Sequence, residues 1–123
     1  MSKQRLALGQ QGENLASAHL QQLGMSIVER NYRQKTGEID IIAKDRETLV
    51  FVEVKTRKTR SFGSPAEAVT IKKQQQISRT AMLYLSRNQL LDSPVRFDVV
   101  SILMTNHSKP CIELIQNAFE TAE

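Results

Sequence analysis

The sequence predicts an α/β fold, a mixed β-sheet of about five strands flanked by helices. Two segments have helical periodicity, and five segments are rich in β-branched and aromatic residues. Their order is helix, three strands, helix, two strands, and the second helix is long enough to connect two parallel strands. The 123 residues contain no repeat or linker, so we expect a single domain over 1–123.

The first helix is expected over residues 5–23. Gly24 would end it, because glycine tolerates the left-handed conformation that often follows a helix. Mostly apolar residues recur at helical spacing along one face, which indicates an amphipathic helix. These residues are Leu8, Leu15, Ala16, His19, Leu20 and Leu23.

Three strands are expected next, over residues 25–32, 38–43 and 48–56. Turn-prone polar residues separate them, at 34–37 and 44–47. The third segment is the most β-rich of the chain.

A basic loop over 57–65 follows, and Ser64-Pro65 is suited to begin a short helical turn that ends at Val69. Thr70 is a candidate cap for a second helix that runs to about Asn88. The side chains expected to face inward are Ile77, Ala81, Tyr84 and Leu85.

The last two strands are expected over 95–103 and 111–115, with a turn over 105–109 between them. Cys111 starts the final strand, and we expect it to be a small, buried, apolar residue there. As the only cysteine it excludes an intramolecular disulfide, which suits a reducing compartment.

Charge and composition narrow the class of protein. A formal net charge of +4 and a pI near 9.5 favour an acidic partner such as nucleic acid, without deciding for it. The N-terminal segment lacks the apolar core of a signal peptide, and no segment approaches membrane-spanning length. We expect a cytoplasmic protein.

Charged residues inside two apolar strands are the main functional signal. Asp40 stands among isoleucines, and Glu53 and Lys55 stand among valines. A buried carboxylate without a partner is costly, so such groups pair, become neutral or hold a metal.

Strand alternation predicts which of these side chains share a face. Glu53 and Lys55 lie on one face of their strand, and on the preceding strand Glu38 and Asp40 share a face opposite Ile39 and Ile41. A turn at residues 45–46 would place Asp40 against Phe51, whereas a wider loop would place it opposite Glu53. Both registers bring Asp40, Glu53 and Lys55 to one face.

Clustered carboxylates repel one another unless a cation lies between them. Mg²⁺ binds carboxylate oxygens, water and phosphate, and can promote attack on a phosphodiester. Lys55 would then position or deprotonate the nucleophile. The alternative is a solvated strand face that carries a weak ion pair.

Other charged residues have two interpretations each. Glu38 either lines the site or forms a structural ion pair, and Asp98 is expected to be a structural partner in the sheet. A basic group downstream of Lys55 is either a solvated surface or a clamp for the nucleic-acid backbone. This group consists of Arg57, Lys58, Arg60, Lys72, Lys73 and Arg79.

Asp40 together with Glu53-Val54-Lys55 resembles the D…(D/E)xK motif of the restriction-endonuclease-like, or PD-(D/E)xK, nuclease superfamily. The wider pattern resembles the YraN-like family of uncharacterised bacterial proteins over most of the chain. The matching segments are Gly12-Glu13, Asn31-Tyr32-Arg33, Gly37-Glu38-Ile39-Asp40, Val50-Phe51-Val52-Glu53-Val54-Lys55, Arg57, Phe62-Gly63, Pro65, Glu67-Ala68-Val69 and Arg96-Phe97-Asp98-Val99-Val100.

This resemblance implies a site and an activity. By similarity to archaeal-type Holliday junction resolvases, Asp40 and Glu53 would bind Mg²⁺ or Mn²⁺ with the Val54 carbonyl, Lys55 would be the catalytic lysine, and Glu13 would reach the site from the first helix. Ile39 stands where some members of the superfamily have proline.

The resemblance also implies a substrate class. The implied activity is endonucleolytic hydrolysis of DNA, at branched or structured sites, and a homodimer would suit two symmetric cuts. Two other interpretations stay open: a non-catalytic nucleic-acid-binding or adaptor protein with the nuclease fold, and a purely structural or protein-interaction module.

Overall fold

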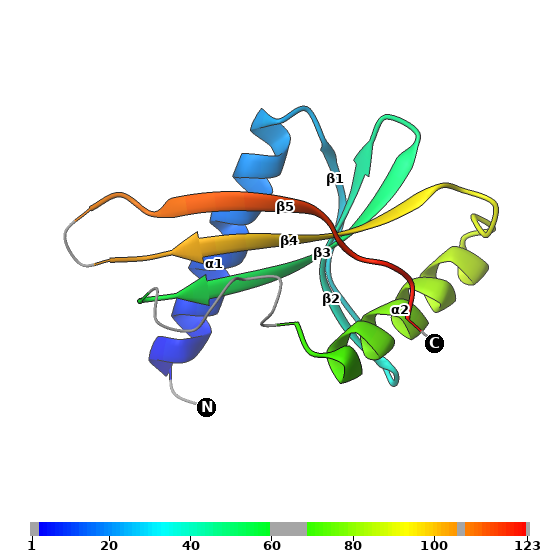
Figure 1. Cartoon of the computed structure of the whole chain (residues 1–123), viewed down its shortest axis with the longest axis horizontal. Coiled ribbons are helices and arrows are strands. Elements are labelled where there is room, and N and C mark those ends of the chain that lie inside the picture. Colours follow the sequence, from blue (N-terminus) through cyan, green and yellow to red (C-terminus); the bar gives the residue numbers. More distant parts are fainter. Residues whose placement is uncertain (1–2, 60–68, 106–107, 123) are drawn as a thin grey trace.

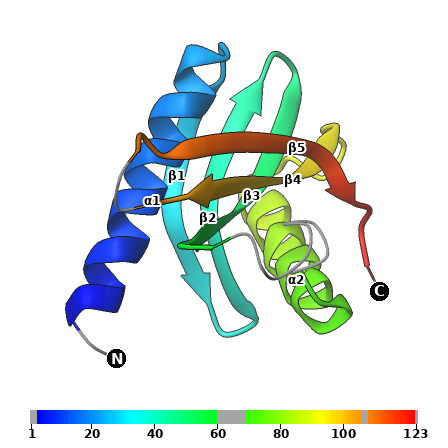
Figure 2. The same cartoon turned by 60° about the vertical axis from the view of Figure 1, so that its left-hand side comes forward.

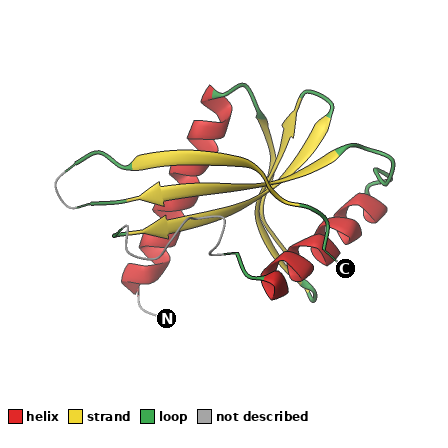
Figure 3. Cartoon of the chain, in the orientation of Figure 1, coloured by secondary structure: helices red, strands yellow, loops and turns green. Residues whose placement is uncertain are grey.

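In the residues that the structure describes, the chain folds into a five-stranded sheet with one helix on each face (Figures 1 and 3). The computed structural model describes residues 3–59, 69–105 and 108–122, and the side chains of the first helix from Leu8 onward. The elements are α1 (Lys3–Gln22), β1 (Ser26–Gln34), β2 (Gly37–Asp45), β3 (Thr48–Arg57), α2 (Ile71–Arg87), β4 (Val95–Leu103) and β5 (Cys111–Phe119). The expected α/β architecture is confirmed, and it is consistent with a restriction-endonuclease-like fold.

The sheet is mixed, and its strand order β1-β2-β3-β4-β5 follows the sequence. Three of its four strand pairs are antiparallel, whereas β3 and β4 are parallel over the whole length of β3 from Leu49. Parallel neighbours need a long crossover, and α2 supplies it. The predicted role of the second helix is therefore confirmed.

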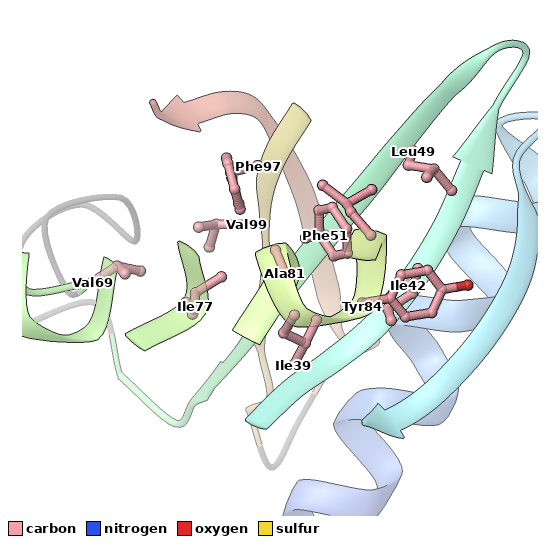
Figure 4. Close-up of a cluster of buried hydrophobic side chains, with 11 residues drawn as sticks. Ile39, Ile42, Leu49, Phe51, Val69, Ile77, Ala81, Tyr84, Phe97 and Val99 are labelled. Atoms are coloured by element: carbon pink, nitrogen blue, oxygen red, sulfur yellow. The ribbon is translucent and has the colours of Figure 1, made fainter. Parts of the chain in front are cut away.

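Each face of the sheet has its own apolar core, so α1 and α2 lie on opposite sides of it (Figure 2). On the α2 side, Phe51 lies between Tyr84 and Phe97, with ring centroids 6.0 and 5.7 Å away (Figure 4). On the α1 side, Leu20 packs against smaller strand residues such as Val52 and Val100. A sheet covered on both faces explains the unbroken apolar runs Ile41-Ile42-Ala43 in β2 and Leu49-Val50-Phe51-Val52 in β3.

The start of α2 matches the sequence prediction. The Thr70 hydroxyl accepts a hydrogen bond from the backbone N–H of Lys73 at 3.1 Å, as expected of an N-cap. The four predicted inward residues of α2 are buried. The short helical turn predicted before Thr70 lies largely outside the described residues.

Several expectations at the ends of elements were wrong. Strand β5 runs to Phe119, beyond the predicted end at 115, because a bulge lets it continue pairing and Phe119 stack on Phe97 with centroids 5.1 Å apart. Cys111 is exposed, since it begins a strand at the edge of the sheet. Leu23 is 53% exposed because α1 ends before it.

Within the described residues, neither helix is long and apolar enough to cross a lipid bilayer.

Candidate functional site

The strands β2 and β3 pair over only part of their length. Their register runs from Asp45 opposite Thr48 to Ile41 opposite Val52, and one further step places Asp40 opposite Glu53. This is the second of the two predicted registers. Figure 1 shows both strands leaving their hairpin together and then separating, with the end of β3 pointing left and the start of β2 lying at the bottom.

Asp40 lies where this separation begins. Its Oδ2 accepts a hydrogen bond from the backbone N–H of Val54 at 2.8 Å. The carboxylate thus satisfies a backbone donor that a continuing strand pair would otherwise satisfy. This bond anchors Asp40 to the strand that carries Glu53.

The alternation of side chains is broken at this point of β2. Ile39 belongs to the core on the α2 side, as Figure 4 shows, whereas Ile41 belongs to the core on the α1 side. The prediction that Ile39 and Ile41 share a face was therefore wrong. A strand without this break would keep them on one face, so simple parity does not describe the surroundings of Asp40.

An open cleft of about 350 Å³ nevertheless contains all the residues to which the resemblance assigns catalysis or metal binding. Both strands contribute to it, and α1 covers one side. The residues that line this cleft are Leu8, Gly9, Glu13, Asp40, Glu53, Val54, Lys55 and Thr56.

Gly12 allows α1 to lie close to β3 beside the cleft. A Cβ atom at Gly12 would overlap the Thr56 hydroxyl and touch Ile102. Glycine inside a helix costs about 0.5–1 kcal/mol relative to alanine. The close approach that glycine allows places the next residue, Glu13, in the cleft.

The pKa of Asp40 is raised to about 8, mainly because burial disfavours its charged form. The negative charge of Glu53 and a hydrogen bond between the two carboxyl groups act in the same direction. The N–H of Val54 acts against them. Since only 8% of Glu53 is exposed, the two groups share a poorly solvated position, and a proton or a cation is needed to relieve their repulsion.

The pKa of Glu13, which reaches the cleft from α1, is also raised. Burial raises its pKa, and the negative charge of Asp40 adds to this effect. Arg30 of β1 acts in the opposite direction, with its Nη2 3.7 Å from Oε1 of Glu13 and 2.8 Å from Oδ1 of Asn14. Sequence reasoning missed Arg30 because nothing local links it to α1.

Lys73 also has a position that the sequence did not indicate. We expected it in the group that clamps nucleic acid, but its Nζ lies 3.8 Å from Oε2 of Glu53. Its neighbour Lys72 is exposed to solvent. The Thr70 cap places Lys73 in the first turn of α2, and only the tertiary structure brings that turn to β3.

The other basic residues do not gather at one place. Arg57 ends β3, and Lys58 follows it on the surface. Arg79 lies on α2 beside Thr36 of the β1–β2 turn, in a groove separate from the acidic cleft. Arg60 lies outside the described residues.

Two acidic residues have structural partners. Glu38 is 3.2 Å from Arg33 in a partly exposed ion pair, and its charge also raises the pKa of Asp40. Asp98 is fully buried and accepts hydrogen bonds from the Arg96 guanidinium, at 3.0 Å, and from the backbone N–H of Asn117, at 3.1 Å. The expected structural role of Asp98 is confirmed.

The carboxyl groups of the cleft can be compared with the ligands that a divalent cation needs. Among the described side chains, no three aspartate, glutamate, histidine or cysteine residues lie close enough together to hold a metal. Asp40 and Glu53 do share a hydrogen bond, and two carboxylates supply the hard oxygen ligands that Mg²⁺ and Mn²⁺ prefer. The pair therefore fits a cation that completes its shell with water and phosphate.

Comparison with known proteins places the chain in a family. Residues 12–102 match the model described as "Uncharacterised protein family UPF0102". A UPF0102 protein of Geotalea uraniireducens (strain Rf4) is 53% identical over 116 residues, which cover 94% of this chain and 91% of that protein. A UPF0102 protein of Nocardia farcinica (strain IFM 10152) is 50% identical over 113 residues, with 92% and 89% coverage. The chain belongs to the UPF0102 family, also known as the YraN-like family.

Proposed function

We propose that this protein is a metal-dependent endonuclease that hydrolyses DNA phosphodiester bonds. The observation that carries this proposal is the pair of Asp40 and Glu53 beside Lys55 in an open cleft, where poor solvation and the charge of Glu53 raise the pKa of Asp40 to about 8. Perturbed carboxyl groups that converge in a cleft are typical of catalytic and metal sites.

Asp40 and Glu53 are the residues that would hold a divalent cation. When bound there, the cation would polarise the scissile phosphate and stabilise charge on the leaving oxygen. Asp40 is held by the N–H of Val54, so its carboxylate stays oriented toward the cleft.

Lys55 would act on the nucleophile. It lines the cleft two residues after Glu53 and supplies a positive charge there. In this position an ammonium can orient an attacking water and stabilise negative charge on phosphate oxygens. Glu13, with its raised pKa, is suited to accept a proton from that water or to bind a second water.

Basic residues at the end of β3 favour a polyanionic substrate. Arg57 and Lys58 follow Lys55 along the chain, so a phosphate backbone that enters the cleft would meet them next. Such contacts give affinity without base recognition. Branched or structured DNA is the substrate class that the resemblance to junction resolvases implies.

The proposal is tested by incubating purified protein with Mg²⁺ or Mn²⁺ and with linear, supercoiled and four-way-junction DNA. We expect cutting that disappears in Asp40→Asn and in Lys55→Gln. Glu47→Gln and Lys44→Gln are matched controls, since these exposed residues lie at the opposite end of the β2–β3 hairpin, and they should keep full activity.

Two results would contradict the proposal. If Asp40→Asn cuts as fast as the original protein, the activity comes from elsewhere. If no DNA is cut, but the protein binds DNA in a salt-sensitive way that neither metal nor Asp40→Asn changes, the protein is a non-catalytic DNA-binding protein or adaptor.

A further inference from the structure

An ion pair links Lys73 of α2 to Glu53 of β3, one of the residues that line the acidic cleft. The ammonium of Lys73 lies 3.8 Å from Oε2 of Glu53. The Lys73 side chain is 35% exposed, whereas that of Glu53 is 8% exposed. A cation that solvent can reach therefore neutralises a carboxylate that solvent barely reaches.

The geometry of this pair allows exchange. A distance of 3.8 Å is within the range of an ion pair but beyond that of a hydrogen bond, about 2.7–3.2 Å. Lysine has a flexible stem and a compact charge, so its ammonium can leave one oxygen for another at little cost. No bidentate contact fixes it in place, unlike a paired arginine.

Glu53 cannot pair with Lys73 and bind a divalent cation equally well at the same time. A cation held by Asp40 and Glu53 would lie within a few ångströms of the ammonium and would repel it. The ammonium would then move away from Glu53, toward the solvent that the Lys73 side chain already reaches. A bound phosphate backbone would offer it new oxygens there.

We propose that Lys73 is a built-in counter-ion that neutralises Glu53 while no divalent cation is bound and transfers to a nucleic-acid phosphate when the cation binds. Because this step regulates the same cleft, it rests on the function proposed above. It predicts that Lys73 weakens metal binding and strengthens DNA binding only in the presence of metal.

Calorimetric titration with Mg²⁺ tests the first half. At pH 8.5, above the pKa of Asp40, protons compete little with the metal. We expect Lys73→Gln to bind Mg²⁺ roughly threefold to tenfold more tightly than the original protein, the upper range for a partly exposed ion pair. Lys72→Gln removes the same charge from the adjacent exposed position and should change the affinity less than about twofold. Lys73→Arg keeps the charge and should stay close to the original.

Fluorescence anisotropy with a phosphorothioate duplex, which resists cleavage, tests the second half. Lys73→Gln should bind this duplex about threefold to tenfold more weakly with Mg²⁺ and equally well without it. An equal loss in both conditions would mean that Lys73 contacts phosphate at all times, and would overturn the transfer step.

The metal titration separates the two proposals. If the original protein binds Mg²⁺ but Lys73→Gln binds it no more tightly, or if Lys72→Gln shows the same gain, the counter-ion role is refuted and the nuclease proposal stands. If the original protein binds neither Mg²⁺ nor Mn²⁺, both proposals are refuted.

Discussion

Replacing Asp40 with asparagine should make the protein more stable at neutral pH and should remove a pH dependence of its stability. Burial and Glu53 raise the pKa of Asp40 from 3.8 to about 8. Between these values the unfolded chain has released this proton, whereas the folded protein still holds it. The free energy of unfolding of the original protein therefore falls as the pH rises from about 4 to about 8.

The size of the effect follows from the shift. Each pKa unit corresponds to about 1.4 kcal/mol, so the cost of the raised pKa at pH 8 is at most ~6 kcal/mol. Asparagine still accepts the N–H of Val54 through its oxygen, and its amide can donate to Glu53 in place of the shared proton. Since the amide must also be buried, we expect a net gain of about 1–3 kcal/mol at pH 8.

Urea unfolding at pH values from 4 to 8 provides the measurement. Asp92→Asn is the matched control, because Asp92 is exposed in the loop before β4 and its substitution should change stability by less than about 0.5 kcal/mol. If Asp40→Asn is less stable than the original protein at pH 8, or if its gain is as large at pH 4, the raised pKa of Asp40 does not lower the stability of the folded protein. A gain accompanied by loss of metal binding would be typical of a functional residue.

Two further substitutions test how the fold positions the cleft, both by urea unfolding. Gly12→Ala should destabilise the protein by about 1–3 kcal/mol through overlap with β3, whereas Gly9→Ala, which meets no neighbouring atom, should stabilise it by up to about 1 kcal/mol; equal effects would refute the close approach. Asp98→Ala should cost about 3–5 kcal/mol because it removes the buried acceptor of both the Arg96 guanidinium and the Asn117 N–H, and leaves Arg96 with Asp45 alone. Glu38→Ala removes a partly exposed pair and should cost less than about 1 kcal/mol, and a similar loss in both variants would contradict this ranking.

Local patterns were sufficient to predict the helices and strands and to single out the charged residues of β2 and β3. The apolar spacing of α2 and its Thr70 cap are short-range features, and both are present in the structure. The charged residues of β2 and β3 stand out in sequence because their neighbours are buried. Strand β5 was predicted too short because its continuation depends on Asp98 and Phe97, which lie in another strand.

The alternation of side chains along β2 and β3 predicted part of the cleft correctly and part of it wrongly. The predicted register of β2 and β3 is present, but Ile39 and Ile41 lie on opposite faces. No rule of alternation announces such a break, because it occurs where one strand pair ends and a side chain replaces the partner strand. The site depends on that end of pairing, which only the twist and separation of the strands decide.

The sequence by itself determined the α/β class, the family and the identity of the charged residues, because each depends on residue type and spacing along the chain. The tertiary structure decided which of those charges meet. Residues far apart in sequence meet there, with Lys73 at Glu53 and Arg30 at Glu13, and the helix that carries Glu13 approaches β3 only because Gly12 has no side chain. Electrostatic energy depends on distance and burial in three dimensions, so the raised pKa of Asp40 became visible only in the folded chain.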